Sequence, residues 1–306
     1  MYINDIQQAS HSSILLYAND SCIVYQHKLT AEIEKQLNKD FKSVCTWFIN
    51  NKLSIHLGKE KTKCILFSLK NKSKEDKTLN IFHNDKKIEQ YSSVTYLGCI
   101  LDESMSGDQM AIKVICPGNN KLKFLYRKNR FLSIYLSWLL CNAIIQPHFD
   151  YACSTWYINL KVCLKNKLKV VQNKCIRFCL RKTFRSHIGF EDFLNMNWLP
   201  VELRVNQIIL CNVFKFFQKT CPSFMAEIFQ PIENQNMITR TSFLRLHQPK
   251  RKTKSGMNSL SYIGPSYWNK LPSNLKISEN INSFKHSLKK YFVETLKENR
   301  NPFFKY

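Results

Sequence analysis

The spacing of apolar residues changes near residue 110, and this change constrains the fold more than any other feature of the chain. Before it, apolar residues come in short runs typical of β-strands, around one long helical pattern. After it, they recur at the three- and four-residue spacing of amphipathic helices. The predicted helices lie at 121–145, 160–182, 190–196, 201–220 and 280–298. The chain therefore predicts an α+β protein whose later part is mainly helical.

The first 110 residues predict a hairpin, a helix and three further strands. Two apolar runs within residues 13–25 flank the polar turn Asn19-Asp20-Ser21, which indicates a β-hairpin. A helix of about 20 residues should begin near Thr30, since apolar residues then recur at close to 3.6-residue spacing. Short strands are predicted at 64–69, 79–82 and 94–100, with a lysine-rich loop at 70–77. We expect the hairpin to expose an apolar face made of Ile14, Leu16, Ile23 and Tyr25.

Charge is distributed unevenly along the chain. Residues 1–108 carry 14 Lys, no Arg and 13 acids, whereas residues 109–306 carry 32 Lys and Arg and 9 acids. A net charge of +24 concentrated in one part indicates a polyanionic partner, either nucleic acid or an anionic membrane surface. Solvated lysines with no partner are the alternative.

The predicted helix at 160–182 is the strongest candidate for nucleic-acid binding. No acid lies between Asp150 and Glu191, while nine Lys and Arg do. Cations outside the apolar seam of one helix can contact successive phosphates without reading sequence. The candidate contacts are Lys161, Lys165, Lys169, Lys174, Arg177 and Arg181.

Cysteine spacing and hydropathy indicate an intracellular protein, either nuclear or cytoplasmic. The twelve Cys include no C-x-x-C pair, and the chain opens without a secretory signal pattern. Cys175, Cys179 and His187 have only a remote resemblance to a zinc site, and buried thiols are the better interpretation. The apolar stretch at 134–145 is too short for a membrane span, so no membrane partner is expected.

Several motifs resemble one family in the same order along the chain. Tyr17-Ala18-Asn19-Asp20 stands at the turn of the predicted hairpin. The other matching segments are MYINDI at 1–6, WFINNKLS at 47–54, KTK at 61–63, VTYLG at 94–98, IQPHFDYA at 145–152, LKVVQNKCIR at 168–177 and GPSYWNKLP at 264–272. Together they resemble the C-terminal half of a non-LTR (LINE-type) retrotransposon reverse transcriptase, whose hairpin box reads Y-A-D-D.

The resemblance implies a partial polymerase palm at 1–110, a helical thumb-like region at 111–185 and a basic C-terminal region of helices and loops at 186–306. Tyr96, Leu97 and Gly98 would then form the hairpin that grips the primer. The motif at 264–272 would form a packed aromatic turn. The implied partners are an RNA template and a DNA primer, or another nucleic acid.

The resemblance also implies a Mg²⁺ site, which this sequence has altered. Such polymerases hold two metal ions with carboxylates, and the hairpin box supplies two of them. Asp20 matches the second carboxylate and would be a vestigial Mg²⁺ ligand, while Asn19 replaces the first with a neutral amide. Tyr17 completes the box. A third carboxylate would come from a strand before residue 1.

The most favoured interpretation is thus a fragment of an RNA-directed DNA polymerase that is inactive as it stands. A non-catalytic RNA- or DNA-binding protein that uses the basic helix is the alternative. A live enzyme whose gene model starts too late is a third, in which Asn19 is unexplained. The oligomeric state is left open.

Overall fold

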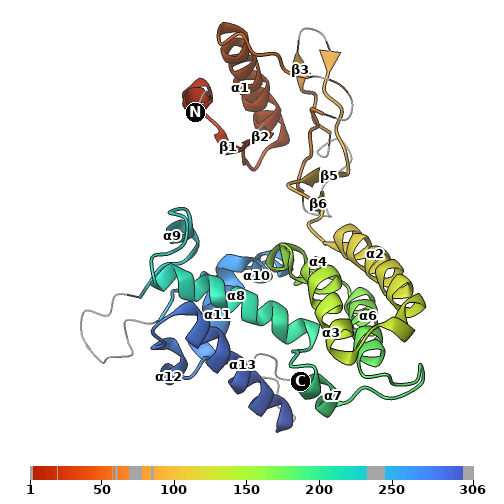
Figure 1. Ribbon diagram of the computed structural model, residues 1–306. Coiled ribbons are helices and arrows are strands. Elements are labelled where there is room, and N and C mark those ends of the chain that lie inside the picture. Colours follow the sequence, from red (N-terminus) through yellow and green to blue (C-terminus); the bar gives the residue numbers. More distant parts are fainter. Residues whose placement is uncertain are drawn as a thin grey trace. The chain divides into compact units, whose positions relative to one another are not determined.

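The computed structural model describes residues 3–18, 20–56, 58, 61–68, 78–83, 86–232 and 245–298. The chain forms two compact units, Met1–Met105 and Ser106–Tyr306. Figure 1 shows the strands and one long helix in the first unit and helices throughout the second. The predicted functional division of the chain at residue 185 stays a prediction.

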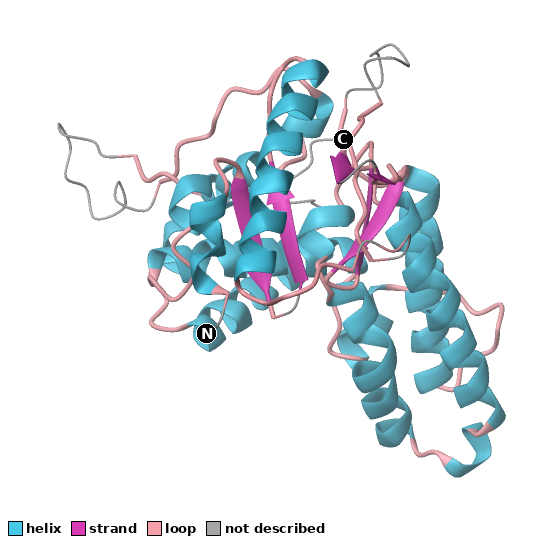
Figure 2. Ribbon diagram, turned by 90° about the horizontal axis from the view of Figure 1, so that it is seen from above, coloured by secondary structure: helices cyan, strands magenta, loops and turns pink. Residues whose placement is uncertain are grey.

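The first unit contains one long helix and three two-stranded antiparallel sheets (Figure 2). Its elements are η1 (Asn4–Ala9), β1 (Ser13–Tyr17), β2 (Asp20–Val24), α1 (Thr30–Asn50), β3 (Phe82–His83), β4 (Lys86–Lys87), β5 (Ser93–Tyr96) and β6 (Cys99–Asp102). The predicted hairpin and the predicted helix from Thr30 are therefore confirmed. In the hairpin, Tyr17 pairs with Asp20 across the turn.

The other predicted strands need correction. Residues 64–68 form no strand, and Cys64 makes only an isolated bridge to Gln90. The strand predicted at 79–82 is reduced to β3. The single strand predicted at 94–100 is instead the β5–β6 hairpin, because Leu97 and Gly98 both have positive φ, 46° and 79°. Two consecutive left-handed residues make the tight turn that reverses the chain. Leu69 and the loop predicted at 70–77 lie outside the described residues.

The apolar face of the first hairpin is covered, contrary to the sequence-based expectation. Ile14 is buried together with Ile6 of η1 and Val44 of α1, and Leu16 and Ile23 pack against this cluster. Helix η1 and helix α1 therefore supply the contacts that we expected to be missing. The opposite face of the hairpin is the exposed one.

A buried carboxylate connects the start of β1 to α1. The side chain of Asp40 accepts hydrogen bonds from the backbone N–H groups of His11 and Ser12, each at 3.1 Å, and from Gln36 Nε2 at 3.0 Å. It also accepts a short hydrogen bond from the Ser12 hydroxyl. Burial favours the neutral acid, but these hydrogen bonds outweigh it and lower the pKa of Asp40. The pair of backbone donors fixes where β1 begins.

The second unit is built from helices. They are α2 (Asp108–Arg127), η3 (Asn129–Phe131), α3 (Ile134–Leu140), the π-helical turn η4 (Cys141–Ile145), α4 (Gln146–Asp150), α5 (Cys153–Trp156), α6 (Val162–Cys179), α7 (Phe190–Asn195), α8 (Val201–Phe217), α9 (Met225–Ile228), α10 (Lys254–Met257), α11 (Leu260–Lys270), α12 (Ser273–Lys276) and α13 (Ile281–Lys297). The helices predicted at 160–182, 190–196, 201–220 and 280–298 are confirmed as α6, α7, α8 and α13.

The helix predicted at 121–145 is wrong at both ends. Helix α2 begins 13 residues earlier and continues through Pro117. It starts after Gly107, whose φ is 74° and where a Cβ atom would lie 2.3 Å from the Trp156 carbonyl oxygen, so only glycine fits. The chain then leaves the helix after Arg127, and a second helix starts after the N-cap Ser133, whose side chain accepts a hydrogen bond from the Leu136 N–H.

The segment at 264–272 forms a buried helix, where we expected a packed aromatic turn. It belongs largely to α11, which packs on α8. Trp268 is fully buried and Tyr267 is 7% exposed, so neither ring is available for stacking on bases. Within the described part of the chain, no helix is long and apolar enough to cross a membrane.

Asp40→Asn should destabilise the first unit by about 1–3 kcal/mol, because an amide offers one acceptor to donors that now share two charged oxygens. Hydrogen exchange at the His11 and Ser12 amides should quicken, whereas Lys39→Ala, an exposed neighbour, should leave it unchanged. Since the folded pKa of Asp40 lies below its unfolded value of about 3.9, the stabilisation is complete above roughly pH 4. It should be lost as the pH falls through the folded pKa. Unchanged exchange in Asp40→Asn would contradict the role of this carboxylate.

Candidate functional site

The Tyr17–Asp20 hairpin presents its box at an exposed tip. The Tyr17 side chain is 64% exposed, and Asp20 is exposed as well. Ala18 occupies the left-handed region with a φ of 51°, as the first position of a two-residue turn requires. Asn19 lies outside the described residues. The sequence and strand register thus place one described carboxylate, Asp20, at this tip.

The described donor set does not fit a two-metal site. Polymerase chemistry needs several carboxylates around a pair of divalent cations, and the β1–β2 hairpin offers Asp20 alone. No group of three or more His, Cys, Asp or Glu side chains able to hold a metal occurs among the described residues.

Tyr96 ends β5 and stands directly before the turn of the second motif hairpin. Partial burial raises the pKa of its hydroxyl, and the charges of Cys22 and Asp20 raise it further. The side chain at the end of β5 therefore lies within electrostatic range of β2. The turn Leu97-Gly98 follows it directly.

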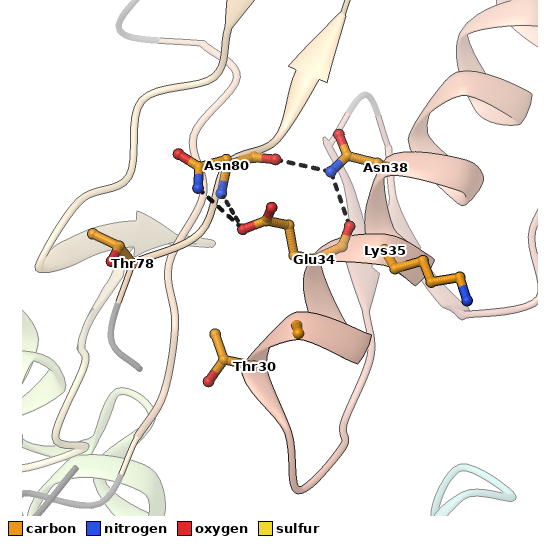
Figure 3. A pocket seen from close by; sticks show the side chains of 7 residues that line it. Thr30, Glu34, Lys35, Asn38, Thr78 and Asn80 are labelled. Carbon is orange, nitrogen blue, oxygen red and sulfur yellow. Dashed lines mark hydrogen bonds between the residues drawn. The ribbon is translucent and has the colours of Figure 1, made fainter. Parts of the chain in front are cut away.

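A polar pocket of about 430 Å³ lies between the start of α1 and the segment before β3 (Figure 3). Its polar groups bond to one another. Asn38 Nδ2 donates to the carbonyl oxygens of Asn80, at 2.8 Å, and Glu34, at 2.9 Å. Glu34 accepts from the Asn80 N–H at 2.8 Å, and the Phe82 N–H donates to Asn38 Oδ1 at 2.9 Å. These groups attach the chain before β3 to α1, so we assign them a structural role.

Most candidate cations of the basic helix have partners within the second unit. Lys161 Nζ lies 2.6 Å from the Asp108 carboxylate. Lys174 Nζ donates to Asn119 Oδ1 at 3.1 Å, and Arg177 Nε donates to the Ser186 carbonyl at 2.9 Å. Arg181 donates a short hydrogen bond to the Leu132 carbonyl and lies over the Phe178 ring. These side chains hold neighbouring segments onto α6.

Lys165 also has its partners within the second unit. Its ammonium donates to the Ile158 carbonyl at 3.3 Å and lies 5.2 Å from the centre of the Tyr157 ring. Burial lowers its pKa. Lys169, one turn further along α6, is exposed and has no hydrogen-bond or ion-pair partner in the described part of the chain. Of the six candidate cations, Lys169 is the one best placed to meet an external ligand.

Two further residues of α6, Lys167 and Gln172, were not among the six candidate cations predicted from the sequence. Lys167 is exposed on the same helix and has no partner among the described residues, so it joins Lys169. Gln172 is buried: it donates to the Leu199 carbonyl at 2.8 Å and accepts from the Val201 N–H at 3.0 Å. Gln172 thereby fixes the start of α8. The position of Gln172 within the apolar stripe of α6 could have predicted this role, because a buried amide needs hydrogen-bond partners.

Exposed aromatic side chains lie in two segments that Arg181 joins. In the first segment, Phe131 is 82% exposed and Tyr135 is 66% exposed, and Leu132 lies between them in sequence. In the second segment, Phe184 lies three residues after Arg181 and is 78% exposed. The Arg181 guanidinium contacts the Leu132 carbonyl and lies 3.4 Å from the Ser137 hydroxyl. The loop after α6 is thus held beside the segment that contains the first two rings.

The thiols near the end of α6 are buried, as expected. Cys175 and Cys179 are each at most 1% exposed, and Cys179 Sγ lies 3.6 Å from Cys141 Sγ. His187 is exposed and forms no metal-binding group with them. By contrast, Cys116 on α2 and Cys163 on α6 are exposed to solvent.

Comparison with known proteins identifies one relationship. The chain is 28% identical over 181 residues to the retrovirus-related Pol polyprotein from type-1 retrotransposable element R1 2 of Nasonia vitripennis. The match covers 55% of this chain and 43% of that protein, so the chain spans less than half the length of this relative. No protein-family model matches, and no solved structure does. The chain is therefore related to non-LTR retrotransposon proteins, as its motifs indicated.

Arg177→Ala should lower the free energy of unfolding by about 1–3 kcal/mol, because it removes a charged donor from the Ser186 carbonyl. Lys169→Ala removes the same charge from an exposed position of the same helix and should change stability by less than about 0.5 kcal/mol. Urea unfolding of the full chain measures both. Equal effects of the two substitutions would show that Arg177 has no structural role.

Proposed function

We propose that this relative of a retrotransposon Pol polyprotein is a part of an RNA-directed DNA polymerase that binds nucleic acid and does not polymerise. Binding uses the helical unit and follows the phosphate backbone, without reading sequence. The partners are an RNA template and a DNA primer, or another nucleic acid. The relationship to a Pol polyprotein supports the class of partner.

The observation that carries the proposal is the shortage of acids around α6. Residues 109–190 hold fifteen Lys and Arg and one acid, Asp150. Asp150 pairs with Arg204 through two hydrogen bonds and so neutralises no cation of α6. Lys167 and Lys169 remain exposed and uncompensated, one on each side of the buried Leu168. Such cations bind phosphates by releasing counterions.

Exposed rings provide a second kind of contact in the same unit. Phe131, Tyr135 and Phe184 are each more than 60% exposed, and the loop that carries Phe184 also carries the exposed Arg185. Bases stack on such rings whatever their sequence, while the cations contact the phosphates. Rings and cations in this combination are typical of surfaces that bind single-stranded nucleic acid.

The proposal that polymerisation is lost rests on Asn19. A neutral amide stands where the related enzymes carry a metal-binding carboxylate. Without that ligand the charge that develops on the transferred phosphoryl group loses its main compensation. Asp20 alone offers a single anionic ligand at the hairpin tip.

Replacing both Lys167 and Lys169 with Ala should weaken duplex binding and reduce the slope of log K against log salt by up to about two. Filter binding or fluorescence anisotropy at several salt concentrations gives the slope. The double variant Lys39→Ala and Lys42→Ala changes the net charge equally, at exposed positions of α1, and should leave the slope unchanged. Equal slopes for the two double variants would rule out α6 as the contact surface.

The purified chain should not extend a primer on an RNA template with either Mg²⁺ or Mn²⁺. Gel analysis of a labelled primer, beside an active reverse transcriptase as control, tests this directly. Template-dependent extension that is abolished by Asp20→Ala would overturn the proposal. Such a result would mean that ligands other than the hairpin box hold the metals.

A further inference from the structure

A small basic pocket lies between α8 and α13, which pack against each other in the second unit (Figure 1). Its volume is about 240 Å³, several times the roughly 30 Å³ that one water molecule occupies in the liquid. The lining side chains belong to α8, to α13 and to the turn before α8. They are Leu199, Arg204, Gln207, Asn282, Lys285, His286 and Lys289.

The pocket gathers donors from one face of α13. Asn282, Lys285, His286 and Lys289 are spaced three, one and three residues apart, so they lie on one side of the helix. Lys289 is half-buried, and its ammonium donates to the Asn197 carbonyl at 2.6 Å. Gln207 Nε2 donates to the Lys285 carbonyl at 3.0 Å, which attaches this face to α8. The Lys285 and His286 side chains are exposed at the mouth of the pocket.

The positive charge of the pocket is not balanced from within. No carboxylate is among its lining residues. Arg204 is paired with Asp150, but Lys285 and Lys289 have no carboxylate partner among the described residues. Burial lowers the pKa of Lys289, and the cations Arg204 and Lys285 lower it further. Two lysines held close together in a concave site therefore lack an anion.

We propose that the pocket between α8 and α13 binds a phosphate group, with Lys285 and Lys289 as its charged donors and Asn282 and His286 as further donors. A phosphate has several acceptor oxygens and can accept from lysines, an amide and an imidazole at once. The site is separate from the exposed face of α6 and does not depend on it. The phosphate belongs either to a nucleic-acid backbone or to a free phosphate compound.

Calorimetric titration of the full chain with inorganic phosphate, at an ionic strength kept constant with chloride, tests the site. Lys285→Ala should weaken phosphate binding about tenfold, as expected for the loss of one charged hydrogen bond. Lys290→Ala removes an exposed charge from the next turn of α13, outside the pocket, and should leave binding unchanged. His286→Ala should weaken binding by a smaller factor.

A second titration with a short single-stranded oligonucleotide distinguishes the two sources of phosphate. If Lys285→Ala weakens both ligands and inorganic phosphate competes with the oligonucleotide, the site binds a backbone phosphate. If the variant weakens inorganic phosphate alone, the site binds a free phosphate compound. No phosphate binding by the unmodified chain, or equal losses in Lys285→Ala and Lys290→Ala, would overturn the proposal. The variant lacking Lys167 and Lys169 should keep its affinity for inorganic phosphate, so the two proposals fail independently.

Discussion

The ion pair between Asp150 and Arg204 is the interaction on which the helical unit depends. It joins α4 to α8, and α8 in turn packs against α6, α11 and α13. Because Asp150 is the single acid of residues 109–190, the other cations of that stretch can pair only with acids outside it, as Lys161 does with Asp108 and Lys182 with Asp192. Several of these cations donate hydrogen bonds to carbonyl or amide oxygens instead, as Lys165, Lys174 and Arg177 do. Oxygen dipoles bind these groups but do not cancel their charge.

That division between bound and unbound cations could not be predicted from sequence. The apolar seam Leu164, Leu168 and Val171 predicted α6 and its buried face correctly, because burial follows directly from helical spacing. The partner of Lys165 is a carbonyl oxygen seven residues earlier, and every residue has a carbonyl, so no residue type marks it. Only the structure separates Lys165 from Lys169.

The errors in the predicted elements have local physical causes. Pro117-Gly118 is a pair typical of helix ends, yet α2 runs through it. Gly118 is buried there, and an added Cβ atom would lie 3.5 Å from Val171 of α6. The single strand predicted at 94–100 is wrong because Leu97 and Gly98 both take positive φ, and the chain reverses there as the hairpin implied by the family resemblance requires. Likewise, Gly264 and Pro265 suggested a turn, whereas close contact with Phe229 keeps them in α11. In α2 and α11, tertiary packing outweighed local propensity. The hairpin that carries Tyr17 and Asp20, by contrast, was predicted correctly, because two apolar runs around a polar turn are enough to indicate it.

The distribution of the twelve thiols makes the chain easy to tag chemically. Cys141, Cys175 and Cys179 are sealed in the interior, and burial or contact with another thiol keeps Cys141 and Cys179 protonated by raising their pKa. Cys116 and Cys163 are the exposed ones. Because Cys163 lies one helical turn before Lys167, a fluorophore attached there would sit beside the outer face of α6. The native Cys163 can therefore be labelled without any substitution of the buried cysteines.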